Sequence, residues 1–362
     1  MRLSFGRWLT VAIVATAFLL VVFFSFEHPP VTTVQKGFRG TAMEQVYNPR
    51  VLAVNAYLQN VPEAPDAADT DGPRAKEVYE NVQVLGELSV GQFGRLMQSM
   101  TEWVSPEVEN AAPGPAARGC AYCHNLENMA EDSVYTKVVA RRMLQMTKHI
   151  NEHWTSHVGE AGVTCYTCHR GNPVPLNNWS QAQTPDPSRG RGFTADSASQ
   201  NLASASVGMA SLPYDIFGPY FEGASDIRVN GTTPLPEGNR HSIKQAEWTY
   251  GLMMHFSQAL NVNCTFCHNS RAFSNWEQST PQRVTAWHGI LMLRDVDTAY
   301  IDPLKPVFPA NRLGPMGDPL KANCTTCHQG AYKPLNGAHV LESHPELNLI
   351  SATPPPPDSA RR

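Results

Sequence analysis

Four short cysteine–histidine motifs are the residues of this sequence with the clearest capacity for chemistry. All 8 cysteines fall into Cys-x-x-Cys-His pentapeptides, which begin at Cys120, Cys165, Cys264 and Cys324. This pentapeptide is the attachment signature of c-type haem. Its two thiols form thioethers with the haem, and the histidine that follows binds the iron as the proximal ligand. The spacing therefore predicts four covalently bound haem c groups.

Each position of the motif has a predicted role. The predicted thioether cysteines are Cys120, Cys123, Cys165, Cys168, Cys264, Cys267, Cys324 and Cys327, and the predicted proximal ligands are His124, His169, His268 and His328. A zinc ribbon does not need a histidine after every second cysteine. A thioredoxin-like pair would occur once, and a disulfide framework would not use four identical spacings. Haem attachment is the interpretation that uses every cysteine.

A sixth ligand decides whether each iron only transfers electrons or also has an open position for catalysis. Methionine with histidine favours a high potential and electron transfer. Met97 or Met100 precedes the first motif, and Met253 or Met254 precedes the third. Methionines on amphipathic helices more often serve core packing, so both members of each pair stay open on the residues alone.

The stretch between the first and second motifs offers two further ligands. Val134 to His157 contains no Pro or Gly and is predicted to be one helix. Met143 and His157 would then lie within about 40° of one face and about 21 Å apart along its axis, so one helix could serve two haems. His149 and His153 are alternatives to His157, and Met292 is the counterpart of Met143 for the last haem. The remaining histidines are predicted not to be ligands: His241, His255, His288, His339 and His344.

An apolar segment near the N-terminus predicts a membrane anchor. Trp8 to Phe26 is an uninterrupted run without a charged residue, preceded by Arg2 and Arg7. About 20 apolar residues span a bilayer, and the basic residues are expected to stay cytoplasmic. A cleaved signal peptide is the alternative, but its apolar core would be shorter and would end in a small-residue site. We expect a single-pass protein whose haem domain is on the periplasmic side of a bacterial inner membrane.

Composition and internal similarity predict the fold class. With 17% charged residues and a formal net charge of -4, the chain is not typical of nucleic-acid-binding proteins. Each half has a helix, a haem motif, a second helix and a second motif, and Ser89–Gln92 and Ser242–Gln245 resemble capping boxes that open the first helix of each half. We predict a mostly α multihaem cytochrome c with extensive loops, two pseudo-symmetric diheme halves and one N-terminal transmembrane helix.

The predicted segments follow one another along the chain without overlap. They are a cytoplasmic N-terminus (1–7), the transmembrane anchor (8–26), an extended segment packing on partner subunits (27–88), the first diheme half (89–172), a connecting segment expected to wrap the surface (173–240), the second diheme half (241–350) and a disordered tail (351–362). Residues 107–119 are expected to form a flexible loop within the first half.

Several longer segments resemble the tetraheme cytochrome c subunit of purple-bacterial photosynthetic reaction centres. The resemblance covers nearly the whole chain after the anchor. The segments that carry it are Gly37–Gly40, Met100–Pro106, Val138–Met143, Gly162–Gly171, Asn263–Asn269 and Ser279–Arg283. They extend well beyond the pentapeptides and are therefore far more specific than Cys-x-x-Cys-His alone.

The resemblance implies one choice for each sixth ligand. It gives Met97, six residues before the Trp of the Thr-Glu-Trp segment, to the first haem and Met143 to the second. It gives Met253 to the third, and it gives His157 from the other half to the fourth, in place of Met292. The family thus implies three His/Met irons and one iron with two histidines.

The family also implies a function without substrate chemistry of its own. Its members hold four haems in a row on the membrane-embedded subunits that carry bacteriochlorophyll, with the haem at Cys264 and Cys267 closest to the special pair. The implied role is an electron carrier, not an enzyme. It takes electrons from a soluble periplasmic cytochrome c or high-potential iron–sulfur protein and reduces the photo-oxidised pair.

The sequence departs from the family at two places. Many members carry a lipidated cysteine where this chain has Ser25, so the uncleaved helix would have to provide the contact with membrane lipid. The 107–119 loop is also longer than usual. Two other classes remain as alternatives. A tetraheme quinol dehydrogenase is generally shorter and relies on histidine ligands, and a multihaem reductase would need an iron without a sixth ligand.

Overall fold

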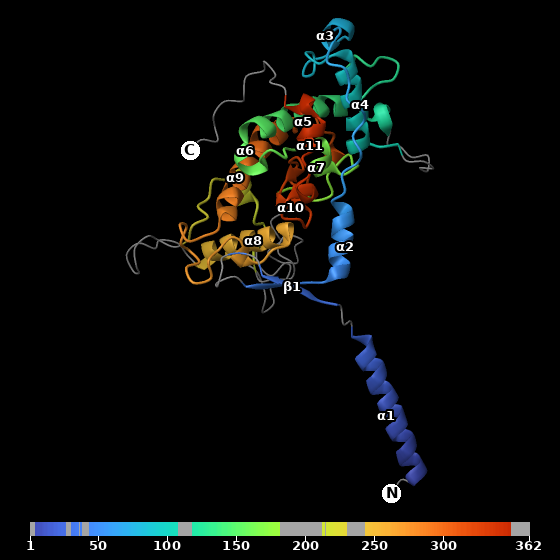
Figure 1. Ribbon diagram of the computed structural model, residues 1–362, viewed down its shortest axis with the longest axis vertical. Helices are drawn as coiled ribbons and strands as arrows, with labels where there is room; N and C mark the ends of the chain where they lie inside the picture. Colours follow the sequence, from blue (N-terminus) through green and yellow to red (C-terminus); the bar gives the residue numbers. More distant parts are fainter. Residues whose placement is uncertain are drawn as a thin grey trace.

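The fold is mostly helical, with long connecting loops (Figure 1). The computed structural model describes residues 4–26, 30–35, 37, 43–107, 118–181, 212–213, 215–229 and 243–348. The predicted tail at 351–362, the cap at Ser242 and most of the 107–119 loop lie outside these residues. The longer helices are α1 (Phe5–Ser25), α2 (Pro49–Leu58), α4 (Val90–Val104), α5 (Tyr135–His153), α8 (Ile243–Leu260) and α9 (Pro281–Asp295).

Short elements complete the described architecture. The short α-helices are α3 (Ala75–Val78), α6 (Thr155–Val158), α7 (Cys165–His169), α10 (Cys324–His328) and α11 (Val340–Ser343). Two small antiparallel ladders occur among the described residues: β1 (Thr32–Gln35) with β2 (Glu44–Tyr47), and β3 (Asn178–Trp179) with β4 (Lys321–Ala322). They are too short to change the helical class that the sequence predicts.

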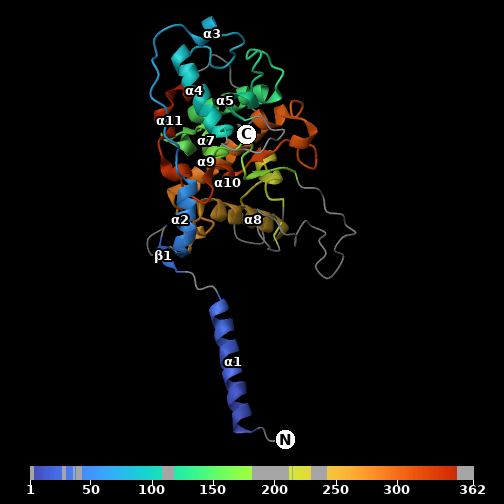
Figure 2. The same ribbon diagram turned by 90° about the vertical axis from the view of Figure 1, so that its right-hand side faces the viewer.

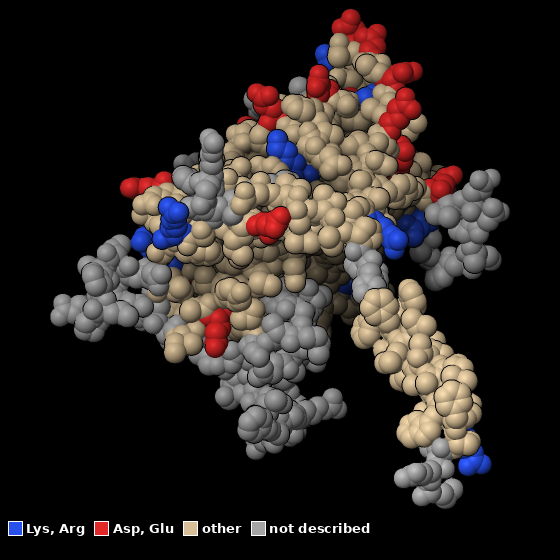
Figure 3. Space-filling view, turned by 60° about the horizontal axis from the view of Figure 1, so that its bottom comes forward, with Lys and Arg blue, Asp and Glu red and all other residues tan. Residues whose placement is uncertain are grey.

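Helix α1 stands apart from the rest of the protein. It projects away from the body in both ribbon views (Figures 1 and 2), and none of its residues is buried. Its mean hydropathy is 2.4 over an 18-residue window. The space-filling view shows no charged side chains on it except at its N-terminal end (Figure 3). The helix begins at Phe5, ahead of the predicted start at Trp8, and its 21 residues are enough to cross a bilayer.

The capping box predicted at Ser89 is confirmed. The Ser89 hydroxyl accepts from the Gln92 backbone N–H at 3.1 Å, and the Gln92 side chain accepts from the Ser89 N–H. These two bonds satisfy donors that a helix start otherwise leaves without partners. Helix α4 ends at Val104, two residues before Pro106, and its buried face includes Leu96 and Trp103.

The helix predicted from Val134 to His157 is broken, and the prediction of one continuous helix was wrong. Helix α5 ends at His153, Trp154 leaves the helical conformation with φ -112° and ψ 28°, and α6 continues the chain. The Trp154 indole donates to the Asp295 carboxylate at 2.8 Å, so a contact with α9 holds the residue at the break. Met143 and His157 therefore lie on two different helices, α5 and α6.

The connecting segment contributes to the core more than the sequence suggests. Ile216, Phe217, Tyr220 and Phe221 are buried, the last two within a short π-helical turn, η2 (Gly218–Glu222). They pack with side chains of α8 and α9 in one apolar cluster. In its described part, residues 215–222 thus fill space beside the second half, in contrast to the expectation that the segment wraps the surface.

The C-terminal part of the described chain docks on α4 through His344. Its Nε2 lies 3.1 Å from the Ser99 hydroxyl, and its ring meets Trp103 edge-on. Burial, together with the charge of Arg95, lowers the pKa of His344 from 6.5 to about 4. The folded protein therefore keeps this histidine neutral at a pH where the unfolded chain protonates it.

We expect stability to fall as the pH drops from 6.5 towards 4, because the unfolded state then binds the extra proton. His344→Gln should reduce this pH-dependent loss in the free energy of unfolding by on the order of 2 kcal/mol. Denaturant titrations at several pH values measure the effect. The exposed His153→Gln should keep the wild-type slope, and equal slopes for all three proteins would contradict the prediction.

Candidate haem sites

All sixteen predicted haem-binding residues line one continuous cavity. Its volume is about 2140 Å³, well above the roughly 300–1,000 Å³ of a site for one small ligand. The lining includes the eight cysteines, the four proximal histidines, Met97, Met143, Met253 and His157. A cavity of this size with four attachment motifs in its wall fits several macrocycles, and the residues present fit haem c.

The four motifs adopt two alternating local conformations. The first and third form 3₁₀ turns, η1 (Gly119–Tyr122) and η3 (Cys264–Phe266). The second and fourth form the short α-helices α7 and α10, which end in a left-handed residue, Arg170 or Gln329. The residue that follows each also has positive φ, and in both cases it is glycine, which adopts this conformation without strain. Each turn places its two cysteines and its histidine on the cavity wall.

Every predicted histidine ligand is oriented by a backbone carbonyl. The Nδ1 atoms of His124, His169, His268, His328 and His157 lie 2.8–3.0 Å from the carbonyl oxygens of Met129, Asn172, Phe273, Ala331 and Thr285, respectively. A hydrogen bond at Nδ1 leaves Nε2 as the lone-pair nitrogen that can bind iron. Such bonds also hold the ring in position and raise its basicity as a ligand.

Burial favours the neutral form of four of these imidazoles, which is the form that metal ligation requires. It lowers the pKa of His157, His169 and His268. Burial and then the nearby His157 lower the pKa of His328 to about 4. A neutral ring needs no deprotonation before its Nε2 donates to a metal.

His157 and His328 face each other across the cavity from different halves of the chain. Their ring centroids lie 6.1 Å apart. A metal–imidazole bond is roughly 2.0 Å long, as measured for zinc. Two such bonds, with the distance from each bonding nitrogen to its ring centre added, give a similar centroid separation. The pair therefore has room for one metal ion between its two rings.

The alternatives to the chosen sixth ligands differ in position. His149 and His153 do not line the cavity, and the His149 Nε2 lies 2.6 Å from the Asp295 carboxylate. Met254 does not line it either, whereas Met100 and Met292 do. Among the histidines predicted not to be ligands, His339 lines the cavity, whereas His255, His288 and His344 do not, and His241 lies outside the described residues.

Gly289 is a site residue that the sequence analysis did not identify. It lies on α9, and a Cβ atom added there would come within 2.6 Å of the His157 ring. Real Cβ atoms do not approach this closely, so only glycine at this position leaves room for the imidazole to pack against the helix. The close approach is a tertiary contact between segments far apart in the sequence, and no local pattern could have indicated it.

We expect Gly289→Ala to displace the His157 ring and to free one coordination position at the fourth motif. Carbon monoxide should then bind the reduced protein at one haem, which difference spectra can measure. Gly91→Ala in α4 is the matched control, because its Cβ would make only ordinary contacts, the nearest at 3.5 Å. Equal carbon monoxide binding by both variants would show that Gly289 does not position a ligand.

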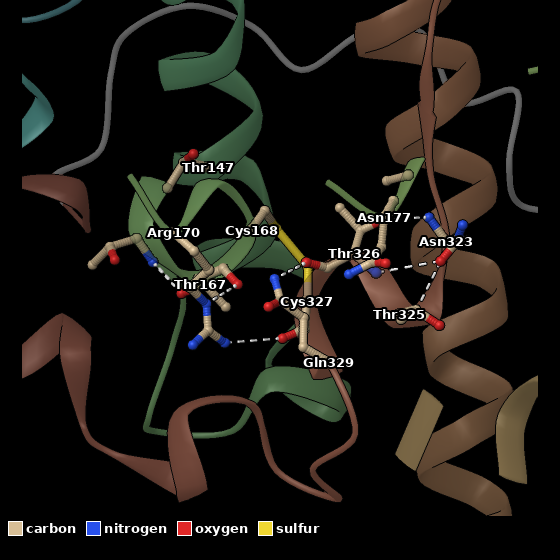
Figure 4. Close-up of a disulfide and its surroundings, with 12 residues drawn as sticks. Thr147, Thr167, Cys168, Arg170, Asn177, Asn323, Thr325, Thr326, Cys327 and Gln329 are labelled. Atoms are coloured by element: carbon tan, nitrogen blue, oxygen red, sulfur yellow. Dashed lines mark hydrogen bonds between the residues drawn. A yellow bond between two sulfur atoms is a disulfide. The ribbon is translucent and has the colours of Figure 1, made fainter. Parts of the chain in front are cut away.

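The structure joins Cys168 and Cys327 in a disulfide, which the sequence analysis did not expect (Figure 4). Helices α7 and α10 lie side by side, and the two Cα atoms are 4.5 Å apart. A sulfur in a disulfide cannot also form a thioether, so attachment of haem at the second and fourth motifs requires both thiols to be free. The other six cysteines are free.

Burial makes most of the free thiols unreactive in the folded chain. It raises the pKa of Cys123 and Cys267 to about 11 and that of Cys165 and Cys324 to about 12. Because the thiolate is the nucleophile, these buried thiols are less reactive at neutral pH than exposed thiols would be.

Comparison with known proteins places this chain in one family. The family model described as photosynthetic reaction centre cytochrome c subunit matches residues 27–348. The photosynthetic reaction centre cytochrome c subunit of Rubrivivax gelatinosus is 52% identical over 95% of this chain and 90% of its own length.

Two further relatives carry the same name. The protein of Thermochromatium tepidum is 48% identical over 95% of this chain and 80% of its own length. That of Roseobacter denitrificans is 40% identical over 88% of this chain and 86% of its own length. The family match includes every motif on the cavity wall, and the resemblance inferred from the sequence is confirmed. The chain therefore belongs to the family of photosynthetic reaction centre cytochrome c subunits, which are membrane-associated electron-transfer components that carry covalently bound haem c.

Proposed function

We propose that this chain carries four haem c groups and relays electrons from a soluble periplasmic donor to the photo-oxidised bacteriochlorophyll pair. The observation that carries the proposal is the single cavity lined by all sixteen predicted residues. When bound, haem c supplies one-electron chemistry between ferric and ferrous iron. One continuous cavity lets four such groups stand close together, as a relay requires.

The chain's own residues would hold and tune these groups. The eight cysteines provide covalent attachment, which for Cys168 and Cys327 requires their disulfide to be open. The four motif histidines bind on one side, and Met97, Met143, Met253 and His157 bind on the other. Met97, Met143 and Met253 each border a separate apolar cluster and also reach the cavity. Three His/Met sites and one site with two histidines leave no open position, so we assign no substrate chemistry to the chain.

Two diheme halves are part of the proposal, and matched hydrogen bonds support them. The Gly171 N–H donates to the Trp103 carbonyl at 2.8 Å, and the Gly330 N–H donates to the Ala259 carbonyl at 2.9 Å. In both cases the helix before one motif is tied to the turn after the next motif. The hydroxyls of Thr136 and Thr280 likewise donate to the carbonyls of Tyr122 and Phe266, at the same sequence separation in each half.

The segment boundaries proposed from the sequence also have support. Helix α1 lies within the proposed anchor and cytoplasmic N-terminus, and α4 begins the proposed first half. We propose that α1 is retained in the lipid and that everything after it is periplasmic. The extended segment at 27–88 would contact the membrane-embedded subunits near the anchor.

Charge supports a basic soluble donor at the end farthest from α1. Acidic side chains gather there, over α3 and α4 (Figure 3). Between residues 63 and 87 the exposed acids are Glu63, Asp66, Asp69, Asp71, Glu77, Glu80 and Glu87, and the basic residues are Arg74 and Lys76. A surface of one sign steers a partner of the opposite sign. A cytochrome c or a high-potential iron–sulfur protein with a basic face would fit it.

Flash-induced absorbance on native membranes tests the relay. We expect haem oxidation in step with recovery of the special pair. Replacing Cys264 and Cys267 by alanine should remove the haem proposed to be closest to the pair and abolish the fast phase. Haems that stay reduced while the pair recovers by another route would overturn the proposal, and quinol oxidation by the purified chain would then support the dehydrogenase class.

A further inference from the structure

Arg170 connects the second and fourth haem motifs. It follows His169 directly, and its left-handed backbone (φ 49°) turns the side chain back across α7. Its Nε donates to the Thr167 carbonyl at 3.1 Å in the second motif, and its Nη2 donates to the Cys327 carbonyl at 3.2 Å in the fourth (Figure 4). One guanidinium group thus touches both motifs.

Gln59 and Leu58, at the end of α2, complete the surroundings of this group. Arg170 Nη1 donates to the Leu58 carbonyl at 2.7 Å, and Nη2 lies 3.3 Å from the Gln59 side-chain oxygen. Gln59 in turn donates to the carbonyls of His328 and Gln329 at 3.2 and 3.1 Å. The position of the charge is therefore determined by three separate parts of the chain.

The charge of Arg170 is not neutralised by any of these partners. All four acceptors are neutral oxygens, and within the described part of the chain no ion pair joins the guanidinium to a carboxylate. The side chain does not line the cavity. Burial lowers its pKa to about 10, which still leaves it protonated at neutral pH.

We propose that Arg170 is a fixed positive charge that raises the reduction potentials at the second and fourth motifs together. The inference rests on the proposed attachment of haem at these motifs. Reduction lowers the net charge of an iron site by one, so a nearby positive charge favours the reduced form. A partly buried charge is screened much less than an exposed one. The two motifs share the charge because their helices lie side by side, with Cys168 and Cys327 Cα atoms 4.5 Å apart.

Redox titration of the purified full chain tests the proposal. Arg170→Gln should lower two of the four reduction potentials by about 59 mV each. For a one-electron couple, this shift corresponds to a tenfold change in the equilibrium ratio of reduced to oxidised iron. Arg170→Lys keeps the charge and should restore most of the shift. Met143→His and His157→Met, which change one sixth ligand each, identify the potentials of the second and fourth motifs. Arg50→Gln is the control, because it removes the same charge from an exposed position on α2. It should leave all four potentials unchanged.

A second variant covers the case in which Arg170→Gln does not fold with four haems. Gln59→Glu is nearly isosteric and places a carboxylate beside the intact guanidinium, so it should lower the same two potentials. The proposal is overturned if neither variant lowers them, or if all four potentials move alike. Such a result would leave the relay intact, because flash-induced haem oxidation measures that function separately.

Discussion

Replacing His157 by methionine should raise one reduction potential and leave the other three unchanged. In the proposed ligand assignment, the fourth motif would then have histidine and methionine ligands instead of two histidines, and methionine ligation raises the potential. We expect an increase on the order of 0.1 V or more, a fraction of the roughly 0.8 V that axial ligands span. Redox titration measures the potential, and the absorption band of an iron–sulfur bond in the oxidised protein should gain intensity.

His153→Met is the matched control for this experiment. His153 is on α5, partly exposed and away from the cavity. Its replacement should change neither the potentials nor the spectrum. If His153→Met reproduced the shift and His157→Met did not, the fourth motif would take its sixth ligand from α5, and the 6.1 Å pairing of His157 with His328 would be structural only.

Replacing Lys321 by methionine should lower the free energy of unfolding by several times more than replacing an exposed lysine. Its side chain has no exposed area, and its Nζ lies 2.7 Å from Asp318, 2.8 Å from Glu222 and 3.5 Å from Asp302. Burial alone would lower the pKa of Lys321, but the carboxylates around it raise the value above 10.5. Removing the cation leaves the buried Asp318 and the partly exposed Glu222 and Asp302 without a counter-charge, which costs about 3–5 kcal/mol where the carboxylate is buried.

Chemical denaturation followed by circular dichroism measures the loss. Lys76→Met is the control, because both side chains of the Lys76–Glu87 pair are largely exposed. Such a surface pair should contribute less than about 1 kcal/mol. Adding Asp318→Asn to Lys321→Met should recover part of the stability, since it removes one uncompensated charge. Equal effects of Lys321→Met and Lys76→Met would mean that the cluster does not stabilise the fold.

The sequence by itself was sufficient to predict features that depend only on residues close together in the chain. A pentapeptide contains everything needed to attach one haem and to supply its proximal histidine, so four motifs were sufficient to predict the attachment points. Helix α1 could be predicted because a bilayer imposes its own length and polarity on a segment. The capping box at Ser89 could be predicted because its hydrogen bonds join residues three positions apart. The longer segments that resemble the family identified it, and the comparisons confirmed the match.

Only the tertiary structure decided the features that join distant segments. The contact between Trp154 and Asp295 coincides with a break in the stretch that the sequence predicts to be one helix, so Met143 and His157 lie on two helices. His157 meets His328 because α6 packs on α9, where Gly289 leaves room for the ring. The proximity of Cys168 to Cys327, and of Arg170 to both motifs, likewise depends on α7 lying beside α10. Attachment is local and covalent, whereas these ligand, charge and packing contacts depend on long-range packing, which no short pattern in the sequence encodes.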